Sequence, residues 1–106
     1  SSTVYFSYDN YNINSTGSEK IKSLASIVKE NGLNVRVEGH CDERGTREYN
    51  LALGEKRANA IAELLIINGV SSNNITTVSY GEEKPASRGS NEKSWSKNRR
   101  ALIKTS

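Results

Sequence analysis

The sequence predicts an α+β sandwich, β-α-β-α-β-β in order, with two main helices packed on one face of a four-stranded mixed sheet. Two observations lead to this prediction. Apolar residues recur at helical spacing in two long segments, and short β-prone runs lie before, between and after them. With 106 residues and 34% apolar content, the chain suits one domain with a modest core, so we expect a single domain over residues 1–106.

The first half of the chain contains a strand, a helix and a second strand. A β-prone run over 3–6 is followed by a polar loop. Thr16 and Glu19 have the spacing of a capping box, and we expect them to open a helix that Gly32 ends. Apolar and polar residues then alternate over 34–40, which predicts a half-buried strand.

The second half begins with a longer helix over about 47–68, for which Thr46 is the expected N-cap. Gly54 lies inside this helix at a cost of about 1 kcal/mol relative to alanine, and we interpret it as a mark of close packing. A third strand is expected over 75–80. After a turn, a polar loop should lead directly to a final strand over 99–104.

Charge and cysteine content exclude several classes of protein. The net charge of +3 and the pI near 9.1 raise the possibility of nucleic-acid binding. Because acidic residues are interleaved with the basic ones, we expect no nucleic-acid partner. Cys41 is the single cysteine, so no internal disulfide forms. The sequence has no apolar run of the roughly 18–20 residues that span a bilayer, and no signal-peptide pattern.

A candidate binding site lies where the second strand leads into the second helix. Asp42 follows the strand, and Asn50, Leu53 and Arg57 share one face of the helix that begins beside it. A carboxylate and a guanidinium flanking one pocket, with Leu53 as its floor, would suit a ligand with both an ammonium and a carboxylate group. Backbone N–H groups at Thr46 would add donors for an anionic oxygen. The alternative is that Asp42 and Arg57 simply pair with each other.

The neighbouring His40 and Cys41 do not indicate an enzyme. Successive side chains at a strand end point to opposite faces, so these two are poorly placed to act as base and nucleophile. The chain has no second histidine or cysteine, so we also expect no catalytic residue, no metal site and no cofactor.

Near the C-terminus, Trp95 lies close to the basic residues Lys97, Arg99 and Arg100. In one interpretation, Trp95 anchors the preceding loop and the charges are solvated. In the other, these residues form a partner surface, because tryptophan and arginine are enriched among interface hot spots.

Four stretches of the chain together carry a family signature. They are residues 39–50 with 53–58, residues 4–9, residues 78–85 and residues 96–101. These stretches resemble OmpA-like peptidoglycan-binding domains, and within that family its lipoprotein branch. The resemblance covers essentially the whole chain.

The resemblance implies a non-catalytic domain that binds the diaminopimelate residue of the peptidoglycan stem peptide. In such domains an aspartate and an arginine grip the zwitterionic centre of that amino acid, and the matching positions here are Asp42 and Arg57. The further pocket positions implied by the family are Tyr8, Asp9, Asn50 and Leu53.

Three positions depart from the family pattern. Cys41 stands where threonine is usual, Lys56 replaces a common arginine, and Tyr8 takes a position that is usually phenylalanine. None of these changes removes either member of the charge pair.

The resemblance also implies partners and a location. These are peptidoglycan, the protein TolB, and an outer membrane reached only through an N-terminal lipid anchor outside this chain, in the periplasm of a Gram-negative bacterium. Two alternatives stay open. In the first, the domain is mainly a TolB-binding module. In the second, it is the wall-binding part of an outer-membrane barrel protein or of a flagellar stator.

Overall fold

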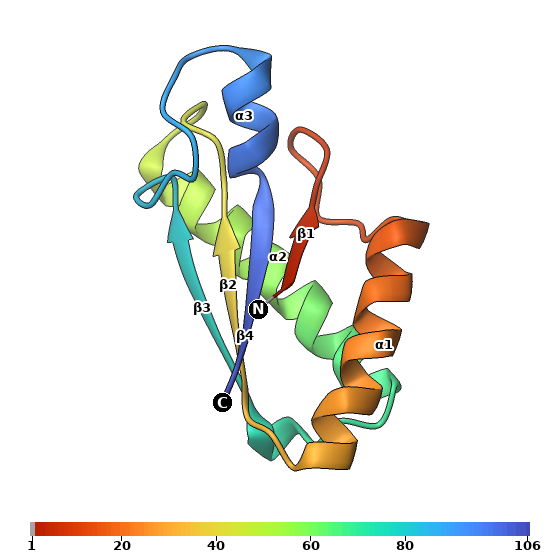
Figure 1. Ribbon diagram of the computed structural model, residues 1–106. Coiled ribbons are helices and arrows are strands. Elements are labelled where there is room, and N and C mark those ends of the chain that lie inside the picture. Colours follow the sequence, from red (N-terminus) through yellow and green to blue (C-terminus); the bar gives the residue numbers. More distant parts are fainter. Residues whose placement is uncertain (1) are drawn as a thin grey trace.

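The computed structural model describes residues 2–106, and it has the two-layer α+β architecture that the sequence predicts (Figure 1). None of the helices within this range is long and apolar enough to cross a membrane. The elements in chain order are β1 (Ser2–Tyr5), α1 (Ser15–Asn31), β2 (Val35–His40), α2 (Arg47–Ile67), the 3-10 helix η1 (Ser72–Asn74), β3 (Ile75–Gly81), α3 (Glu92–Asn98) and β4 (Arg100–Thr105).

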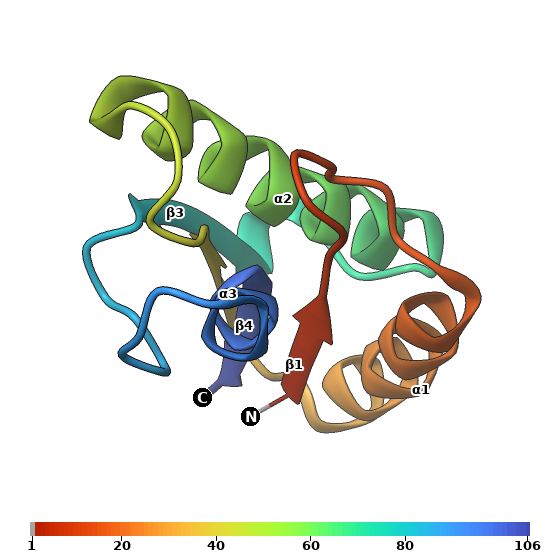
Figure 2. The same ribbon diagram turned by 90° about the horizontal axis from the view of Figure 1, so that it is seen from above.

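The four strands form one mixed sheet in the order β1-β4-β2-β3. β2 is parallel to β3 and antiparallel to β4, and β1 pairs antiparallel with the other side of β4. Seen from above, α1 and α2 lie on the same side of the sheet (Figure 2). The prediction of two main helices on a mixed sheet is therefore confirmed, and β2 lies between two hydrogen-bonded neighbours.

The core fills the space between the sheet and the two long helices. Val35 and Val37 of β2 and Ile103 of β4 are buried there, together with Ile61 and Leu65 of α2. These apolar side chains recur at period two in the strands and at helical spacing in α2, as the sequence pattern predicts.

The prediction that β2 is half-buried is wrong for two of its polar residues. Glu38 and His40 are buried as well, although they alternate with the core-facing valines. Glu38 forms ion pairs with Arg36 and Lys104, and its Oε1 lies 3.3 Å from His40 Nε2. Because β2 is central, long side chains from the same strand and from its neighbour cover Glu38.

The two long helices begin and end at local signals, one of which differs from the prediction. α1 is capped by Asn14, whose Oδ1 accepts the Gly17 N–H at 2.8 Å, and not by a capping box opening at Thr16. Gly32 ends α1 in the left-handed conformation, with φ of 59°, as expected. Thr46 caps α2 as expected, because its hydroxyl accepts the Tyr49 N–H at 3.1 Å.

The predicted polar loop before the last strand contains a third helix, α3, capped by Asn91. The last strand begins at Arg100, one residue later than predicted. Arg99 and Arg100 are both buried, so the expectation of solvated charges is wrong for them. Arg99 donates to the Phe6 carbonyl and Arg100 to the Lys84 carbonyl, and carbonyls and neighbouring side chains replace water around both cations.

Gly39 and Gly54 allow β2 and α2 to approach closely, which confirms the packing interpretation of Gly54. A Cβ added at Gly39 would overlap the Gly54 carbonyl oxygen, and one added at Gly54 would clash with the Ser79 hydroxyl. The contact at Gly39 is with backbone, which cannot rotate away. This close approach sets the position of α2 relative to the end of β2.

We expect Gly39→Ala to destabilise the domain by about 3 kcal/mol or more, because relieving the overlap requires a backbone shift. Urea unfolding at neutral pH measures the change. Ala52→Ser is a matched control that adds one heavy atom on an exposed position of α2, and it should cost less than about 1 kcal/mol. Equal effects of the two substitutions would contradict the packing argument.

Candidate functional site

A cavity of about 200 Å³ lies at the end of the sheet where β2 passes into α2. Its wall comes from the loop after β1, from the segment that joins β2 to α2, and from the first turns of α2. The residues that line it are Tyr8, Asp9, Cys41, Asp42, Arg44, Gly45, Tyr49, Asn50, Leu53 and Arg57. Six of the seven predicted site residues are in this set, and Thr46 is not.

Asp42 is the buried carboxylate of the cavity, and it is 5% exposed. Its Oδ1 accepts the backbone N–H of Arg44 at 3.0 Å and the Arg44 Nε–H at 3.1 Å. Its Oδ2 accepts Arg44 Nη2 at 2.8 Å and lies 3.7 Å from Arg99 Nη1. Burial alone would raise the pKa of Asp42, but these hydrogen bonds and cations hold it below its ordinary value, so the group is ionised at neutral pH.

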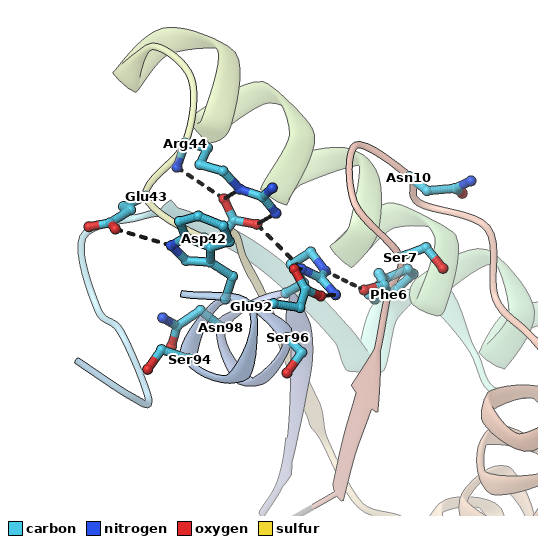
Figure 3. A network of polar contacts seen from close by, with 12 residues as sticks. Phe6, Ser7, Asn10, Asp42, Glu43, Arg44, Glu92, Ser94, Ser96 and Asn98 are labelled. Carbon is cyan, nitrogen blue, oxygen red and sulfur yellow. Dashed lines mark hydrogen bonds and ion pairs between the residues drawn. The ribbon is translucent and has the colours of Figure 1, made fainter. Parts of the chain in front are cut away.

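The Arg44 guanidinium lies between two aromatic rings. Its central carbon is 4.0 Å from the centroid of the Tyr8 ring and 4.1 Å from that of Trp95. Trp95 belongs to α3 and donates its indole N–H to Glu43 at 3.1 Å. Figure 3 shows Arg44 and Asp42 facing each other, with Glu92 of α3 nearby. Trp95 therefore closes over the segment between β2 and α2.

Arg57 is fully buried beneath the cavity, with 0% exposure. Its Nε donates to the Asn10 carbonyl at 2.9 Å, Nη1 to the His40 carbonyl at 2.8 Å and Nη2 to the Ser7 carbonyl at 3.2 Å. These bonds use three of the five guanidinium N–H groups. Burial lowers the pKa of Arg57, but an arginine remains charged in proteins.

The alternative in which Asp42 and Arg57 pair with each other is wrong. The ion pairs of Asp42 are with Arg44 and Arg99, and Arg57 bonds to backbone carbonyls. The cavity therefore has a carboxylate and a buried cation that do not neutralise each other directly.

Other predicted residues hold the segment in place. The buried Asn50 side chain donates to the Arg44 carbonyl at 2.9 Å, the Asp42 carbonyl at 3.3 Å and Glu82 Oε1 at 2.9 Å. Thr46 is the N-cap of α2 and its hydroxyl is used there. Leu53 is buried and supplies apolar surface to the cavity. Asn50 and Thr46 thus fix the backbone around Asp42.

Tyr8 and Asp9 come from the loop after β1 and complete the rim of the cavity. Tyr8 is 60% exposed, and Asp9 adopts a left-handed backbone conformation with φ of 51°. The Tyr49 hydroxyl of α2 donates to Asp9 Oδ1. This hydrogen bond ties the loop across the mouth of the cavity to the first turn of α2.

His40 and Cys41 have separate environments. The Cys41 thiol donates to the Asn50 carbonyl at 3.2 Å, and burial raises its pKa to about 11. His40 bonds to Glu38 and stacks on Tyr80. The thiol is thus neutral at pH 7, and its hydrogen bond runs to a carbonyl oxygen of α2. Over residues 2–106, no group of three or more His, Cys, Asp or Glu side chains is placed to hold a metal ion.

The sequence pattern does not identify three residues of the site, namely Arg44, Tyr49 and Arg99. Arg44 lies two residues after Asp42, a spacing at which a loop readily brings a cation back to a carboxylate, so this pair had a local signal. Tyr49 reaches Asp9 across 40 residues of chain, and Arg99 reaches Asp42 across 57 (99 − 42). Such contacts depend on how loops fold back onto the sheet end, and periodicity does not reveal them.

The chain belongs to the OmpA family, whose model matches residues 5–99. Two relatives are named peptidoglycan-associated lipoprotein. That of Pseudomonas putida is 45% identical over 102 residues, covering 96% of this chain and 61% of the relative. That of Pasteurella multocida is 47% identical over 102 residues, covering 95% of this chain and 68% of the relative. The family resemblance drawn from the sequence is confirmed, and the chain spans about three-fifths of the Pseudomonas relative.

A solved structure agrees with this assignment, and a second shares the fold. The crystal structure of the peptidoglycan-associated lipoprotein from Burkholderia pseudomallei superimposes with a TM-score of 0.95 at 39% identity, covering 98% of this chain and 89% of that one. The C-terminal domain of Helicobacter pylori MotB gives a TM-score of 0.89 at 24% identity, covering 99% and 84% of the two chains. The second likeness shows a shared fold only.

We expect the domain to lose stability as the pH falls from about 6.5 to about 4. Burial and the nearby Arg100 lower the pKa of His40 from 6.5 to about 4, against the opposing effect of Glu38. In this window the unfolded chain binds a proton that the folded chain does not, so the free energy of unfolding decreases by at most about 3 kcal/mol. Urea unfolding across the window measures the loss.

His40 is the single histidine of the chain, so His40→Gln tests its part directly. Between pH 7 and pH 5 the variant should show a much flatter dependence of the unfolding free energy on pH. A slope equal to that of the unsubstituted domain would assign the effect to other groups.

Proposed function

We propose that this domain binds peptidoglycan non-covalently through the diaminopimelate of the stem peptide, and that it has no catalytic role. In this proposal it ties the outer membrane to the cell wall as part of a Tol-Pal system. It lies in the periplasm of a Gram-negative bacterium, anchored at the outer membrane by lipid through the N-terminal side of the whole protein. Names of relatives such as the Pseudomonas putida peptidoglycan-associated lipoprotein support the assignment.

The observation that carries the proposal is the separation of charge in the cavity. Asp42 is ionised on one side, and the buried cation Arg57 lies beneath. The distal end of diaminopimelate bears an ammonium and a carboxylate on one carbon, and such a zwitterion matches one anion and one cation held a short distance apart. A low-dielectric surrounding strengthens both interactions.

In this proposal Asp42 accepts the ligand ammonium, and the two Arg57 N–H groups that carbonyls leave unused face the ligand carboxylate. Leu53 contacts the aliphatic chain, and Tyr8 and Asp9 close the rim. Asn50 and Thr46 act indirectly, by holding the segment that carries Asp42.

We expect a stem peptide with diaminopimelate to bind about 10- to 100-fold more tightly than the same peptide with lysine. Lysine lacks the second carboxylate, and losing a charge-assisted hydrogen bond costs about 1.5–3 kcal/mol. Titration calorimetry with the two peptides measures the ratio. This comparison tests the Arg57 side of the site without removing a residue on which three backbone carbonyls depend. Equal affinities would reject the proposed mode of binding.

We expect Asp42→Asn to weaken binding of the diaminopimelate peptide by a factor of about 10 or more, because the amide keeps the shape but loses the charge. Glu48→Gln is the matched control. It removes one negative charge from the first turn of α2 at an exposed position outside the cavity lining. If the two variants bind alike, Asp42 is not the ammonium acceptor.

A second candidate function is docking of TolB, favoured by the exposed aromatic rim of the cavity. Tyr8 is 60% and Tyr49 52% exposed, and tyrosine is enriched at interfaces. If wall and TolB binding are separable, Asp42→Asn should retain TolB in a pull-down while losing the diaminopimelate peptide. If Tyr49→Ser loses TolB binding but keeps peptide binding, TolB docks on the rim. If substitutions of Tyr8 and Tyr49 leave TolB binding unchanged, TolB does not dock there.

A further inference from the structure

We propose that Arg44 is an internal competitor for the ligand. In the ligand-free domain its guanidinium occupies the place of the ligand ammonium at Asp42, and binding displaces it from the slot between Tyr8 and Trp95. This inference rests on the proposed function and concerns the same cavity.

Arg44 uses most of the acceptor capacity of Asp42. A carboxylate has about four lone-pair positions. Two N–H groups of Arg44 reach Oδ1, while a third from Arg44 reaches Oδ2, which also faces Arg99 Nη1 at 3.7 Å. With Asp42 only 5% exposed, Arg44 leaves little of the carboxylate open to a ligand ammonium.

Repulsion between like charges opposes the binding of a ligand ammonium beside Arg44. An ammonium that shared the carboxylate with Arg44 would lie within a few ångströms of a guanidinium, in a partly buried site where repulsion is weakly screened. Exchange of one cation for the other avoids this repulsion. The slot itself has the features of a cation site, with an aromatic face on each side and a carboxylate at its end.

The three arginines near Asp42 differ in how easily their guanidinium groups can move away from the cavity. Arg57 is buried and donates to three backbone carbonyls, and the buried Arg99 donates to the Phe6 carbonyl. The Arg44 guanidinium is held by Asp42 and the two rings, with 29% of its side chain exposed. Tyr8, one wall of the slot, is 60% exposed, so Arg44 can swing into water without leaving a buried carbonyl unpaired.

Displacement of Arg44 has a quantitative consequence. The apparent dissociation constant equals the intrinsic one divided by the fraction of molecules whose slot is open. If Arg44 fills the slot in most molecules, removing its side chain raises affinity, whereas a residue that merely positions Asp42 would lower affinity on removal.

The test combines binding with the emission of Trp95, the single tryptophan of the chain. Titration of the unsubstituted domain with the diaminopimelate stem peptide should change Trp95 emission as the guanidinium leaves its ring. Arg44→Ala should bind the peptide about 3- to 10-fold more tightly. Its emission without ligand should already resemble that of the saturated, unsubstituted domain and change little on titration.

Arg47→Ala is the matched control, because Arg47 is an exposed cation of α2 that pairs with Glu83 and lies outside the cavity lining. It removes the same charge from the same region and should leave both affinity and the emission change as they were. Arg44→Lys keeps the charge but loses the fork geometry, so its affinity should lie between those of Arg44→Ala and the unsubstituted domain. It also covers the case in which Arg44→Ala fails to fold.

Binding by the unsubstituted domain without a change in Trp95 emission would overturn the competitor role and leave the proposed function standing. If Arg44→Ala and Arg44→Lys bind the peptide more weakly than Arg47→Ala, the competitor role is likewise overturned and the proposed function stands. Absence of binding in the unsubstituted domain and in all three variants would overturn both. Binding in Arg44→Ala alone would support displacement strongly, because the slot would then be closed in nearly every unsubstituted molecule.

Discussion

The site depends on one buried guanidinium. Arg57 projects from α2 and donates to carbonyls of Ser7 and Asn10 in the loop after β1 and of His40 at the end of β2. Three segments that are distant in sequence therefore meet on a single side chain, and the cavity lies where they converge. The centroid of the Phe6 ring lies 5.2 Å from the guanidinium carbon of Arg57, which adds a cation–π contact. Without this cation, the three carbonyls would each lose a donor, and at the buried His40 carbonyl such a loss is costly.

This arrangement also explains why Asp42 stays ionised without pairing with Arg57. A direct pair between Asp42 and Arg57 would have cancelled both poles of the site. Instead, backbone dipoles balance Arg57, and Arg44 and Arg99 on the other side keep Asp42 ionised despite its burial. The close approach of Gly39 to Gly54 sets the height of α2 above β2 and hence the distance between the two poles. Fold and electrostatics are thus linked through the start of α2.

Features that depend on one clear local pattern could be predicted, whereas contacts across the chain, and local signals that have a competing alternative nearby, could not. Thr46 was recognised as a cap, and α2 as one long helix, because capping and periodicity are properties of neighbouring residues. The role of Asn14 was missed because Thr16, two residues away, offers a second plausible cap. α3 was missed because its seven residues carry no apolar periodicity, and with it the position of Trp95 over Arg44. The ion-pair partner of Asp42 is Arg44, two residues away. The spacing permits this contact, but the prediction concerns Arg57, fifteen residues away on a helix face, as the second charge of the pocket.

The three arginines around Asp42 differ in what holds them, and this difference bears on how the domain selects a ligand. Backbone carbonyls hold Arg57, and the Phe6 carbonyl and the Glu92 carboxylate hold Arg99. Asn50 fixes the backbone that carries Asp42 and Arg44. Hydrogen bonds therefore hold Arg57, Arg99 and the backbone around Asp42, while an ion pair and two ring faces hold the Arg44 side chain. If binding displaces Arg44 as we propose, the domain discriminates between ligands by exchanging one cation for another, not by closing around the shape of a ligand. A neutral ligand that fills the cavity would have to separate Arg44 from Asp42 without replacing the positive charge, and burial of the unpaired carboxylate would oppose its binding.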